Sequence, residues 1–359
     1  MSLKPSPNWL LGFVPVSFAL ERAHAAPTLV FFSAALAIIP AARLIVQGTE
    51  HISVRTGDAI GGLLNATFGN LPELIIATVA LRQGLLEMVR ASIIGAILAN
   101  LLLALGVAML AAGLRHQKQE FNAGAARVYS SMMLLAVICL AGPGAFERVF
   151  SAADYSAQVR SINAWLALLL LLVYGLYLFF MLGTHRAEFT TPEGEHGHGD
   201  EHRPAWGLPR ALGTLIGASV LAAFMSEILV GAAEGTGEAL GMSQTFIGMI
   251  VVAVVGGAAE SLSAIAAGAR NKLDLTMGIV YGSCIQIALF VAPALVLLSA
   301  FIAPEPLYLS FGRIELGTLF LAVLIGAAVA NDGRGNWFKG AQLLAVYTML
   351  ALLLYFVPA

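Results

Sequence analysis

The sequence predicts an all-α membrane protein with eleven transmembrane helices, an extra first helix followed by two inverted five-helix repeats. The first reason is the composition: of 359 residues, 59% are hydrophobic and 11% are charged, whereas soluble domains carry about 25% charged residues. The second is the recurrence of apolar runs near the roughly 20 residues that cross a bilayer. The third is one long polar stretch that leaves five such runs on each side, once the first run is set aside.

The expected helices are separated by charged or Gly/Pro-rich breaks. In chain order they span residues 8–22, 28–46, 59–83, 88–112, 126–145, 160–183, 208–230, 243–268, 273–298, 312–330 and 338–357. We group them as an extra N-terminal helix, a first repeat, an acidic and His-rich cytoplasmic loop, and a second repeat, at residues 1–26, 27–183, 184–206 and 207–359. Because five crossings is an odd number, two related halves insert in opposite orientations.

The basic residues predict the orientation in the membrane. Of the 19 Lys and Arg residues, all but six fall on the side that holds the N-terminus; the six are Arg22, Arg82, Arg90, Arg148, Arg160 and Arg313. Since Lys and Arg concentrate in cytoplasmic loops, we expect a cytoplasmic N-terminus, an outer C-terminus and a bacterial inner membrane. No basic patch with interleaved aromatic residues indicates a nucleic-acid partner.

Two glutamates stand near the middle of apolar spans. Glu73 follows Gly69 by four residues in the third span, and Glu260 follows Gly256 by four in the eighth. A charge at bilayer depth costs at least roughly 2.5 kcal/mol, so such residues face a partner, a cavity or an ion pathway. Stapling helices through a hydrogen bond is the alternative role, but two glutamates in matching contexts favour an ion site.

Helix breaks are expected beside both glutamates. Pro72 has no amide hydrogen, so the Phe68 carbonyl loses its helical partner and becomes a candidate ligand, while Gly69 lets the backbone open. In the second half, Gly256 and Gly257 loosen the helix in the same way. Each break therefore frees backbone oxygens near a carboxylate.

Further oxygen donors lie close by in the sequence. Asn70 precedes Glu73 by three residues, which places both side chains on one helix face; the next spans carry Asn100, Ser283 and Gln286. Carboxylate, amide, hydroxyl and carbonyl oxygens are the ligands of a hard cation such as Ca²⁺, and the two glutamates are the predicted metal ligands. For Asn100, Ser283 and Gln286, simple bridging between membrane helices stays open.

The same pair of carboxylates suggests an exchange reaction. One divalent cation or two protons neutralise the pair equally, so the two can compete for one site. Cys139 and Cys284 lie in separate spans and are expected to pack helices. No nitrogen or sulfur ligand lies near the glutamates, which argues against zinc, copper or iron. We expect no resident cofactor, with Ca²⁺ as the substrate and H⁺ as the counter-ion.

Two other acidic features are less specific. Glu50 and Glu227 fall near opposite mouths of the expected bundle, where they suit ion-attracting vestibules or are merely solvated. The loop at residues 184–206 either holds cations weakly and regulates transport, or links the two halves. Its glycines favour the linker.

Three segments resemble a known family. The segments GGLLNATFGNLPELIIATVALRQG, SIIGAILANLLLALG and GSCIQIALFVAPALVL closely resemble signatures of the calcium/proton antiporter (CAX) family, within the calcium/cation antiporter superfamily. The resemblance runs over nearly the whole chain. It implies a calcium/proton antiporter with eleven helices, two inverted repeats and an acidic loop. It also implies that the GNxxE element, here Gly69, Asn70 and Glu73, forms one side of the calcium site.

Two positions depart from the family's pattern. The second element usually reads GNAAE, but Gly257 replaces its asparagine and Glu260 is kept. The GSxxQ element is intact at Gly282, Ser283 and Gln286, whereas its counterpart in the first half has Ala96 in place of serine. Fewer oxygen donors imply weaker calcium binding, a water in the gap, or a broader choice among divalent ions.

Alternative functions differ in what they require. A sodium/calcium or broader divalent exchanger is the nearest alternative, although the threonine/serine pattern of sodium-coupled relatives is absent. A membrane-embedded hydrolase with Glu73 and Glu260 as acid and base is remote, because the spans contain no HExxH or GxSxG motif. A passive cation channel could not drive calcium uphill.

Overall fold

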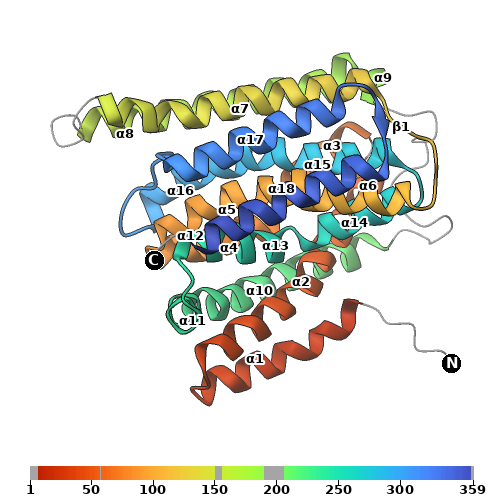
Figure 1. The fold of residues 1–359 in the computed structure, drawn as a ribbon. Coiled ribbons are helices and arrows are strands. Elements are labelled where there is room, and N and C mark those ends of the chain that lie inside the picture. Colours follow the sequence, from red (N-terminus) through yellow and green to blue (C-terminus); the bar gives the residue numbers. More distant parts are fainter. Residues whose placement is uncertain (1–6, 57, 150–155, 190–205, 357–359) are drawn as a thin grey trace, which may run out of the picture.

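The structure is a computed structural model that describes residues 7–56, 58–149, 156–189 and 206–356. Figure 1 shows a bundle of helices that run roughly alongside one another, with α1, α2 and α10 at one edge and α7 and α8 at the other. The elements of the first half are a 3₁₀ turn Pro7–Gly12, α1 (Phe13–Arg22), α2 (Pro27–Thr56), α3 (Asp58–Phe68), α4 (Leu71–Arg82), α5 (Leu86–Leu98), a π-helical segment Ala99–Ala104, α6 (Leu105–Gly113), β1 (Gln119–Glu120), α7 (Ala123–Val149), α8 (Ser156–Phe179), a π-helical segment Phe180–Thr184 and α9 (Arg186–Phe189).

The second half has a similar order of elements. They are α10 (Leu208–Gly231), α11 (Ala233–Leu240), α12 (Gln244–Phe246), a π-helical segment Ile247–Val252, α13 (Ala253–Gly256), α14 (Ala258–Ala269), α15 (Leu273–Gln286), a π-helical segment Ile287–Val291, α16 (Ala292–Ile302), α17 (Arg313–Ala330), β2 (Arg334–Gly335) and α18 (Trp337–Tyr355). Most of the polar loop at residues 184–206 lies outside the described residues.

Eight helices within the described residues are long and apolar enough to cross a membrane. They coincide with eight of the predicted spans. The other three predicted spans are the short first helix and the two that carry the glutamates, which are both interrupted. In the second half, the segment before the glutamate is also preceded by a sharp bend of 116° between Ala233–Leu240 and Gln244–Gly256.

Element boundaries recur at a constant spacing along the chain. Leu71 and Ala258 begin α4 and α14, and Arg82 and Ala269 end them. Leu86 and Leu273 begin α5 and α15, while Leu105 and Ala292 begin α6 and α16. The members of each of these four pairs are 187 residues apart. The π-helical segments Ala99–Ala104 and Ile287–Val291 follow the same relation to within one or two residues.

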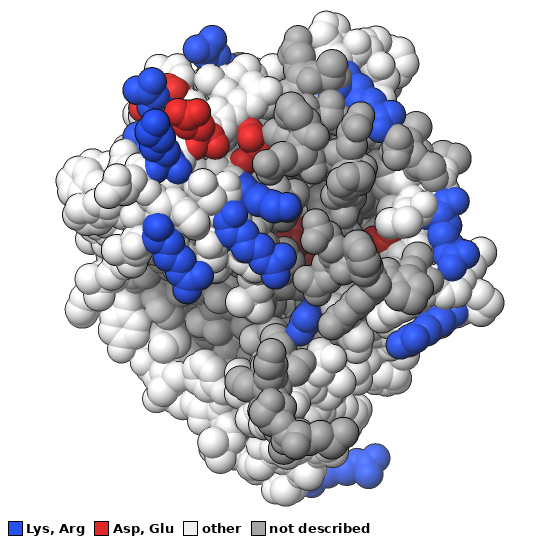
Figure 2. Space-filling model, turned by 90° about the vertical axis from the view of Figure 1, so that its right-hand side faces the viewer, with Lys and Arg blue, Asp and Glu red and all other residues white. Residues whose placement is uncertain are grey.

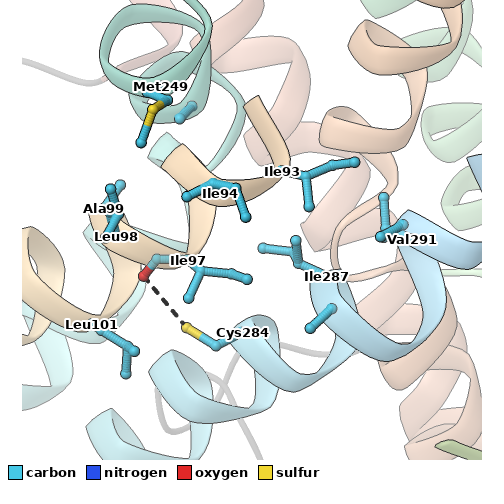
Figure 3. Packing of buried hydrophobic residues seen from close by; sticks show 14 of the residues in the cluster. Ile93, Ile94, Ile97, Leu98, Ala99, Leu101, Met249, Cys284, Ile287 and Val291 are labelled. Atoms are coloured by element: carbon cyan, nitrogen blue, oxygen red, sulfur yellow. Dashed lines mark hydrogen bonds between the residues drawn. The ribbon is translucent and has the colours of Figure 1, made fainter. Parts of the chain in front are cut away.

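Packing at the centre joins the two halves. In Figure 3, side chains from α5, including Ile93, Ile94 and Ile97, lie against Ile287 and Val291 of the segment after α15. The buried Cys284 thiol donates a hydrogen bond to the Ile97 carbonyl at 3.7 Å. Residues 97 and 284 are themselves 187 positions apart, so matching positions of the two halves meet here. Cys284 thus packs helices together, while Cys139 is half-buried in α7.

The two ends of the bundle differ in charge. We call the end that holds the connections α6–α7, α14–α15 and α17–α18 the basic face. Its exposed cations include Arg115, Lys118, Arg270, Lys272 and Arg334. Figure 2 views this end directly and shows Lys and Arg side chains around its periphery. The end that holds the connections α4–α5, α10–α12 and α16–α17 is the opposite face.

A small clasp ties two connections together on the basic face. Strand β1 pairs with β2 in antiparallel register, an element that hydrophobic patterning did not predict. Lys339 Nζ donates to the carboxylate of Asp332 at 2.6 Å and to the Arg334 carbonyl at 2.7 Å. The Lys339 ammonium thereby holds the pKa of the Asp332 carboxyl below its usual value. The clasp fixes the start of α18 relative to the end of α17.

Candidate ion-binding site

Both glutamates lie in the first turn of a helix that starts at an interruption. Helix α3 ends at Phe68, and α4 begins at Leu71 with Glu73 in its first turn. Helix α13 ends at Gly256, and α14 begins at Ala258 with Glu260 in its first turn. The unpaired amide groups and the dipole at a helix N-terminus favour a negative charge. Each of these two helices thus carries a glutamate at its N-terminus, beside the interruption.

The local sequence explains where each break falls. Pro72 occupies the first turn of α4, where its missing amide hydrogen costs no helical bond. Asn70 is the N-cap, with φ −94° and ψ 28°. It therefore lies at the interruption itself, and its carbonyl accepts the Leu74 amide hydrogen at 3.1 Å, so that Asn70 and Glu73 belong to the same first turn. In the second half, Gly257 takes the N-cap position with φ −77° and ψ 5°.

Each glutamate packs against the glycines of the other half. A Cβ atom added to Gly256 would lie 3.1 Å from Glu73 Cγ, and one added to Gly257 would lie 3.5 Å from Glu73 Oε1. In the same way, a Cβ atom on Gly69 would lie 3.0 Å from Glu260 Oε1. Gly257, beside Glu73, is the N-cap of the helix that carries Glu260, and Gly69, beside Glu260, immediately precedes the N-cap of the helix that carries Glu73. The glycines therefore provide the space that brings the two carboxylates together.

A polar network surrounds the Glu260 end of the site. Ser283 Oγ donates a hydrogen bond to Glu260 Oε2. Asn70 Nδ2 donates to Gln286 Oε1 at 2.8 Å, and Gln286 Nε2 donates to the Thr67 carbonyl at 3.2 Å. This network joins α3 and the start of α4 to α15. Its two bonds to Gln286 connect residues more than 200 positions apart in the sequence. The predicted side chains of Asn70, Ser283 and Gln286 therefore lie near one another.

Glu73 stands in a different environment. Both of its carboxylate oxygens are buried, and neither has a hydrogen-bond partner among the described residues. It lines a small cavity, with room for about one water molecule. The other lining residues are Ile76, Ala77, Ser92, Ile93, Ala96, Val252, Ala253, Gly256, Ile287 and Val291. Apart from Glu73, only Ser92 in this lining carries a polar side chain.

The remaining predicted ligands are placed less centrally. Asn100 lies in the π-helical segment Ala99–Ala104, is 2% exposed, and has an amide nitrogen without a partner among the described residues. Its role in ion binding stays a prediction, as does that of the Phe68 carbonyl at the end of α3. The carbonyl of Thr67, which the sequence argument missed, is the one that accepts from Gln286. The break at Gly69 was the signal that could have identified it.

The two predicted vestibule residues differ in their surroundings. Glu50 is half-buried in α2, a helix that also carries Arg43. Glu227 is exposed near the end of α10 at the opposite face and forms an ion pair with Arg82 at 3.7 Å. Neither takes part in the hydrogen bonds of the network around Glu260, and their part in attracting ions stays a prediction.

The candidate ligands are all oxygen atoms, which suit a hard cation. Two carboxylates, two amide oxygens, a hydroxyl and a carbonyl are all oxygen donors, which Ca²⁺ takes in groups of six to eight. Among the described residues, no group of three or more His, Cys, Asp or Glu side chains forms a metal cluster. A cation at this site would therefore depend on neutral oxygens as well as on the two glutamates.

Comparison with known proteins extends these observations. The family model described as "Sodium/calcium exchanger protein" matches residues 26–183 and 210–356, one match in each half of the chain. The Ca(2+)/H(+) antiporter of Aphanothece halophytica is 38% identical over 97% of this chain and 96% of its own length. The Ca(2+)/H(+) antiporter ChaA of Bacillus subtilis is 39% identical over 94% of this chain and 95% of its own length.

Solved structures have the same fold. The structure of native YfkE matches 98% of this chain and 100% of its own, with a TM-score of 0.83 and 35% identity. An H+/Ca2+ exchanger named CAX matches at a TM-score of 0.70 and 13% identity over 97% of this chain and 91% of its own, which speaks for the fold alone. The chain therefore belongs to the sodium/calcium exchanger protein family and, within it, to the calcium/proton antiporters that its motifs resemble.

Proposed function

We propose that this protein is a secondary active antiporter that exports cytosolic Ca²⁺ in exchange for H⁺. The observation that carries the proposal is the pair of glutamates, each on an interrupted helix and each packed against the glycines of the other half. The relatives are named antiporters and exchangers, and the hydrolase alternative is set aside on that ground. Ca²⁺ is the substrate, H⁺ is the counter-ion, and no resident cofactor is required.

The coupling follows from charge balance at the pair. Two carboxylates in a buried site cannot both remain charged and unpartnered, because burying an uncompensated charge costs several kcal/mol. One Ca²⁺ neutralises both charges, and so do two protons. If the site can reorient only when it is neutral, Ca²⁺ crosses in one direction and two protons in the other. Glu73 and Glu260 carry the coupling, while Asn70, Ser283 and Gln286 complete the ligand set.

We infer that the architecture is an extra helix followed by two inverted five-helix repeats, making eleven crossings. The constant spacing of 187 residues between matching boundaries supports this, as does a separate family match in each half. The three crossings beyond the eight long helices are α1 with the turn before it, α3 with α4, and the segment from α12 to α14. Such inverted pairs place a substrate site between discontinuous helices at the membrane midplane.

We infer further that the basic face is cytoplasmic. The exposed Lys and Arg residues of its connections support this orientation. The N-terminus is then cytoplasmic and the C-terminus is outside. The bacterial relatives favour an inner membrane as the location.

Calcium uptake into everted membrane vesicles tests the function. With respiration acidifying the vesicle interior in a medium without sodium, we expect Ca²⁺ uptake that stops when a protonophore and a K⁺/H⁺ ionophore abolish the proton gradient. Vesicles that contain the Glu73→Gln variant at equal membrane levels serve as the control. Uptake that requires a sodium gradient and ignores ΔpH would instead establish a sodium/calcium exchanger, and uptake that never exceeds equilibrium would indicate a channel.

A further inference from the structure

The two halves of the site are not equally equipped. The spacing of 187 residues pairs Gly69 with Gly256 and Glu73 with Glu260. It also pairs the polar residues of one half with small residues of the other: Asn70 with Gly257, Ser283 with Ala96, and Gln286 with Ala99. Where the Glu260 end has a hydroxyl and an amide from α15, the matching positions at the Glu73 end are alanines, and Asn100, one position beyond Ala99, does not line the cavity beside Glu73.

The contacts in the structure follow this difference. Glu260 accepts a hydrogen bond from Ser283, and Gln286 is held by Asn70 and by the Thr67 carbonyl. At the other end, Ala96 lines the cavity beside Glu73, and the Glu73 carboxylate has no partner among the described residues. The cavity thus lies beside Ala96, where Ser283 has no counterpart, and a Cβ atom on Gly257 would lie 3.5 Å from Glu73 Oε1.

The buried Glu73 carboxylate needs hydrogen-bond donors, and none is present among the described residues. Leaving it charged without a partner is costly, and a cavity that offers two to four polar partners can hold water. The Glu73 oxygens supply two acceptors. The Ser92 hydroxyl donates to the Val89 carbonyl at 2.8 Å and keeps its lone pairs for another donor. A cation bound between the glutamates would add a further partner for a water molecule held there.

We propose that the site binds its divalent cation asymmetrically, with protein oxygens on the Glu260 side and retained water on the Glu73 side. In this arrangement Ala96 and Gly257 determine specificity. Protein oxygens in a fixed cage discriminate among cations by size, whereas water adapts to the ion it surrounds. Mg²⁺ and similar small cations give up water reluctantly. The half-hydrated site therefore accepts Mn²⁺ and Mg²⁺ in competition with Ca²⁺ more readily than a site with both halves filled.

The inference is tested by cation binding, which depends on the site alone, and by transport, which also rests on the proposed function. The first variant is Ala96→Ser, which adds a hydroxyl at the position that matches Ser283. The second is Gly257→Asn, which adds the amide that matches Asn70. The φ of −77° at Gly257 suits any residue, and its Cβ atom would meet neighbours only at ordinary contact distances of 3.4 Å or more. The control is Ala111→Ser, which makes the same change as Ala96→Ser at a half-buried position of α6 that does not line the cavity.

Equilibrium binding of ⁴⁵Ca²⁺ to the purified protein, with Mn²⁺ and Mg²⁺ as competitors, is the decisive measurement. In the wild type we expect Mn²⁺ to displace Ca²⁺ within about a hundredfold excess. Either variant should bind Ca²⁺ about three- to tenfold more tightly, the effect of one added polar contact. Either variant should also need a proportionally larger excess of Mn²⁺, whereas Ala111→Ser should match the wild type.

The contrary results are equally specific. A wild-type site that excludes Mn²⁺ at a thousandfold excess would overturn the proposal, as would two folded variants whose Ca²⁺ affinity and Mn²⁺ competition equal those of the wild type. The same competition measured on ΔpH-driven uptake should reproduce the order of the variants. If the wild type binds Ca²⁺ with the expected competition but shows no ΔpH-driven uptake, the proposed function fails while the asymmetric site stands.

Discussion

At the scale of single residues, Glu73 and Glu260 have equivalent places in their helices but different partners. Glu260 is held by Ser283, and Glu73 faces a cavity. The carboxylate held by a fixed hydroxyl is the better positioned ligand, and the carboxylate without a partner is the one that depends most on the cation or on protons. In the proposed exchange both are needed for charge balance, so their loss should have similar consequences.

We predict that Glu73→Gln and Glu260→Gln each abolish exchange, reducing ΔpH-driven Ca²⁺ uptake by at least about a hundredfold. A single remaining carboxylate neither neutralises a divalent cation nor carries two protons, and a buried net charge is strongly unfavourable. Initial rates in everted vesicles, normalised to membrane levels of each variant, provide the measurement. Near-normal uptake by either variant would contradict the two-carboxylate account.

Ser283→Ala should weaken Ca²⁺ binding without abolishing turnover. The substitution removes the donor to Glu260 and one oxygen of the site, and a hydrogen bond to a charged group contributes about 1.5–3 kcal/mol. We expect the KM for Ca²⁺ to rise about tenfold or more, with Ser283→Thr retaining most of the affinity because it keeps the hydroxyl. If Ser283→Ala and Ser283→Thr behave alike, the hydroxyl has no role in the site.

How far the sequence predicts the site can be judged from particular residues. The helix position of Glu73 and Glu260 follows from Pro72 and the glycines beside them. The pairing of Asn70 with Gln286 does not, because those residues are 216 positions apart and only the packing of the two halves joins them. The free Glu73 carboxylate also could not be predicted, since it depends on which neighbours happen to be alanine.

At the scale of helices, the two interrupted segments differ in how tightly they pack. A Cβ atom on Gly95 of α5 would lie 2.1 Å from the Met249 carbonyl, and one on Gly248 would lie 2.7 Å from the Met88 carbonyl. The segment before α13 is therefore pressed against α5. The matching glycine of α15, Gly282, has no atom of the described residues within 4 Å of its added Cβ atom. At these matching positions, α5 is in close contact with the interrupted segment of the second half, whereas α15 has no corresponding close contact among the described residues.

This difference predicts a variant that separates binding from turnover. If the halves exchange conformations during transport, Gly282 must receive a close backbone contact as Gly95 does here. Gly282→Val should then fold and bind Ca²⁺ within about threefold of the wild type but lose at least tenfold in exchange rate, because the valine blocks the second conformation. Melting temperature and ⁴⁵Ca²⁺ binding report on the first point, and vesicle uptake reports on the second. Normal uptake would show that the glycine contact is not formed in the cycle.

Helix irregularities mark the limit of pattern-based prediction. Hydrophobic runs located the eight long helices to within a few residues at most ends. They did not indicate the π-helical segments Ala99–Ala104, Ile247–Val252 and Ile287–Val291. Such segments add a residue to a turn without changing the apolar composition, and they often occur at functional sites. All three adjoin helices that contribute to the cavity or to the network.

At the scale of the whole molecule, the proposed ion site is formed by both halves of the chain together. The order of the eight long helices and the concentration of Lys and Arg at one end could be anticipated from hydropathy and charge. The small β-clasp could not, because two-residue strands leave no periodic pattern. The acidic and His-rich loop between the halves lies mostly outside the described residues, and its composition alone favours a linker.

Replacing residues 188–202 with a neutral Gly/Ser segment of equal length should therefore leave maximal exchange within about twofold of the wild type. A linker only has to span the two halves, and flexible segments of this composition do so. The rate of Ca²⁺ uptake at saturating Ca²⁺ measures this, with the dependence on Ca²⁺ concentration as a second readout. Complete loss of uptake at normal membrane levels would assign the loop a direct part in transport.

The central claim is that one divalent cation sits between Glu73 and Glu260, and it is tested most directly by locating the ion. Crystals grown with saturating Ca²⁺ at neutral pH should give one anomalous scattering peak between the two carboxylates, about 2.3–2.6 Å from oxygens on the Glu260 side. The peak should be lost in Glu260→Gln crystals. Both carboxylates ordered without an ion at saturating Ca²⁺, or a peak elsewhere in the bundle, would contradict the account.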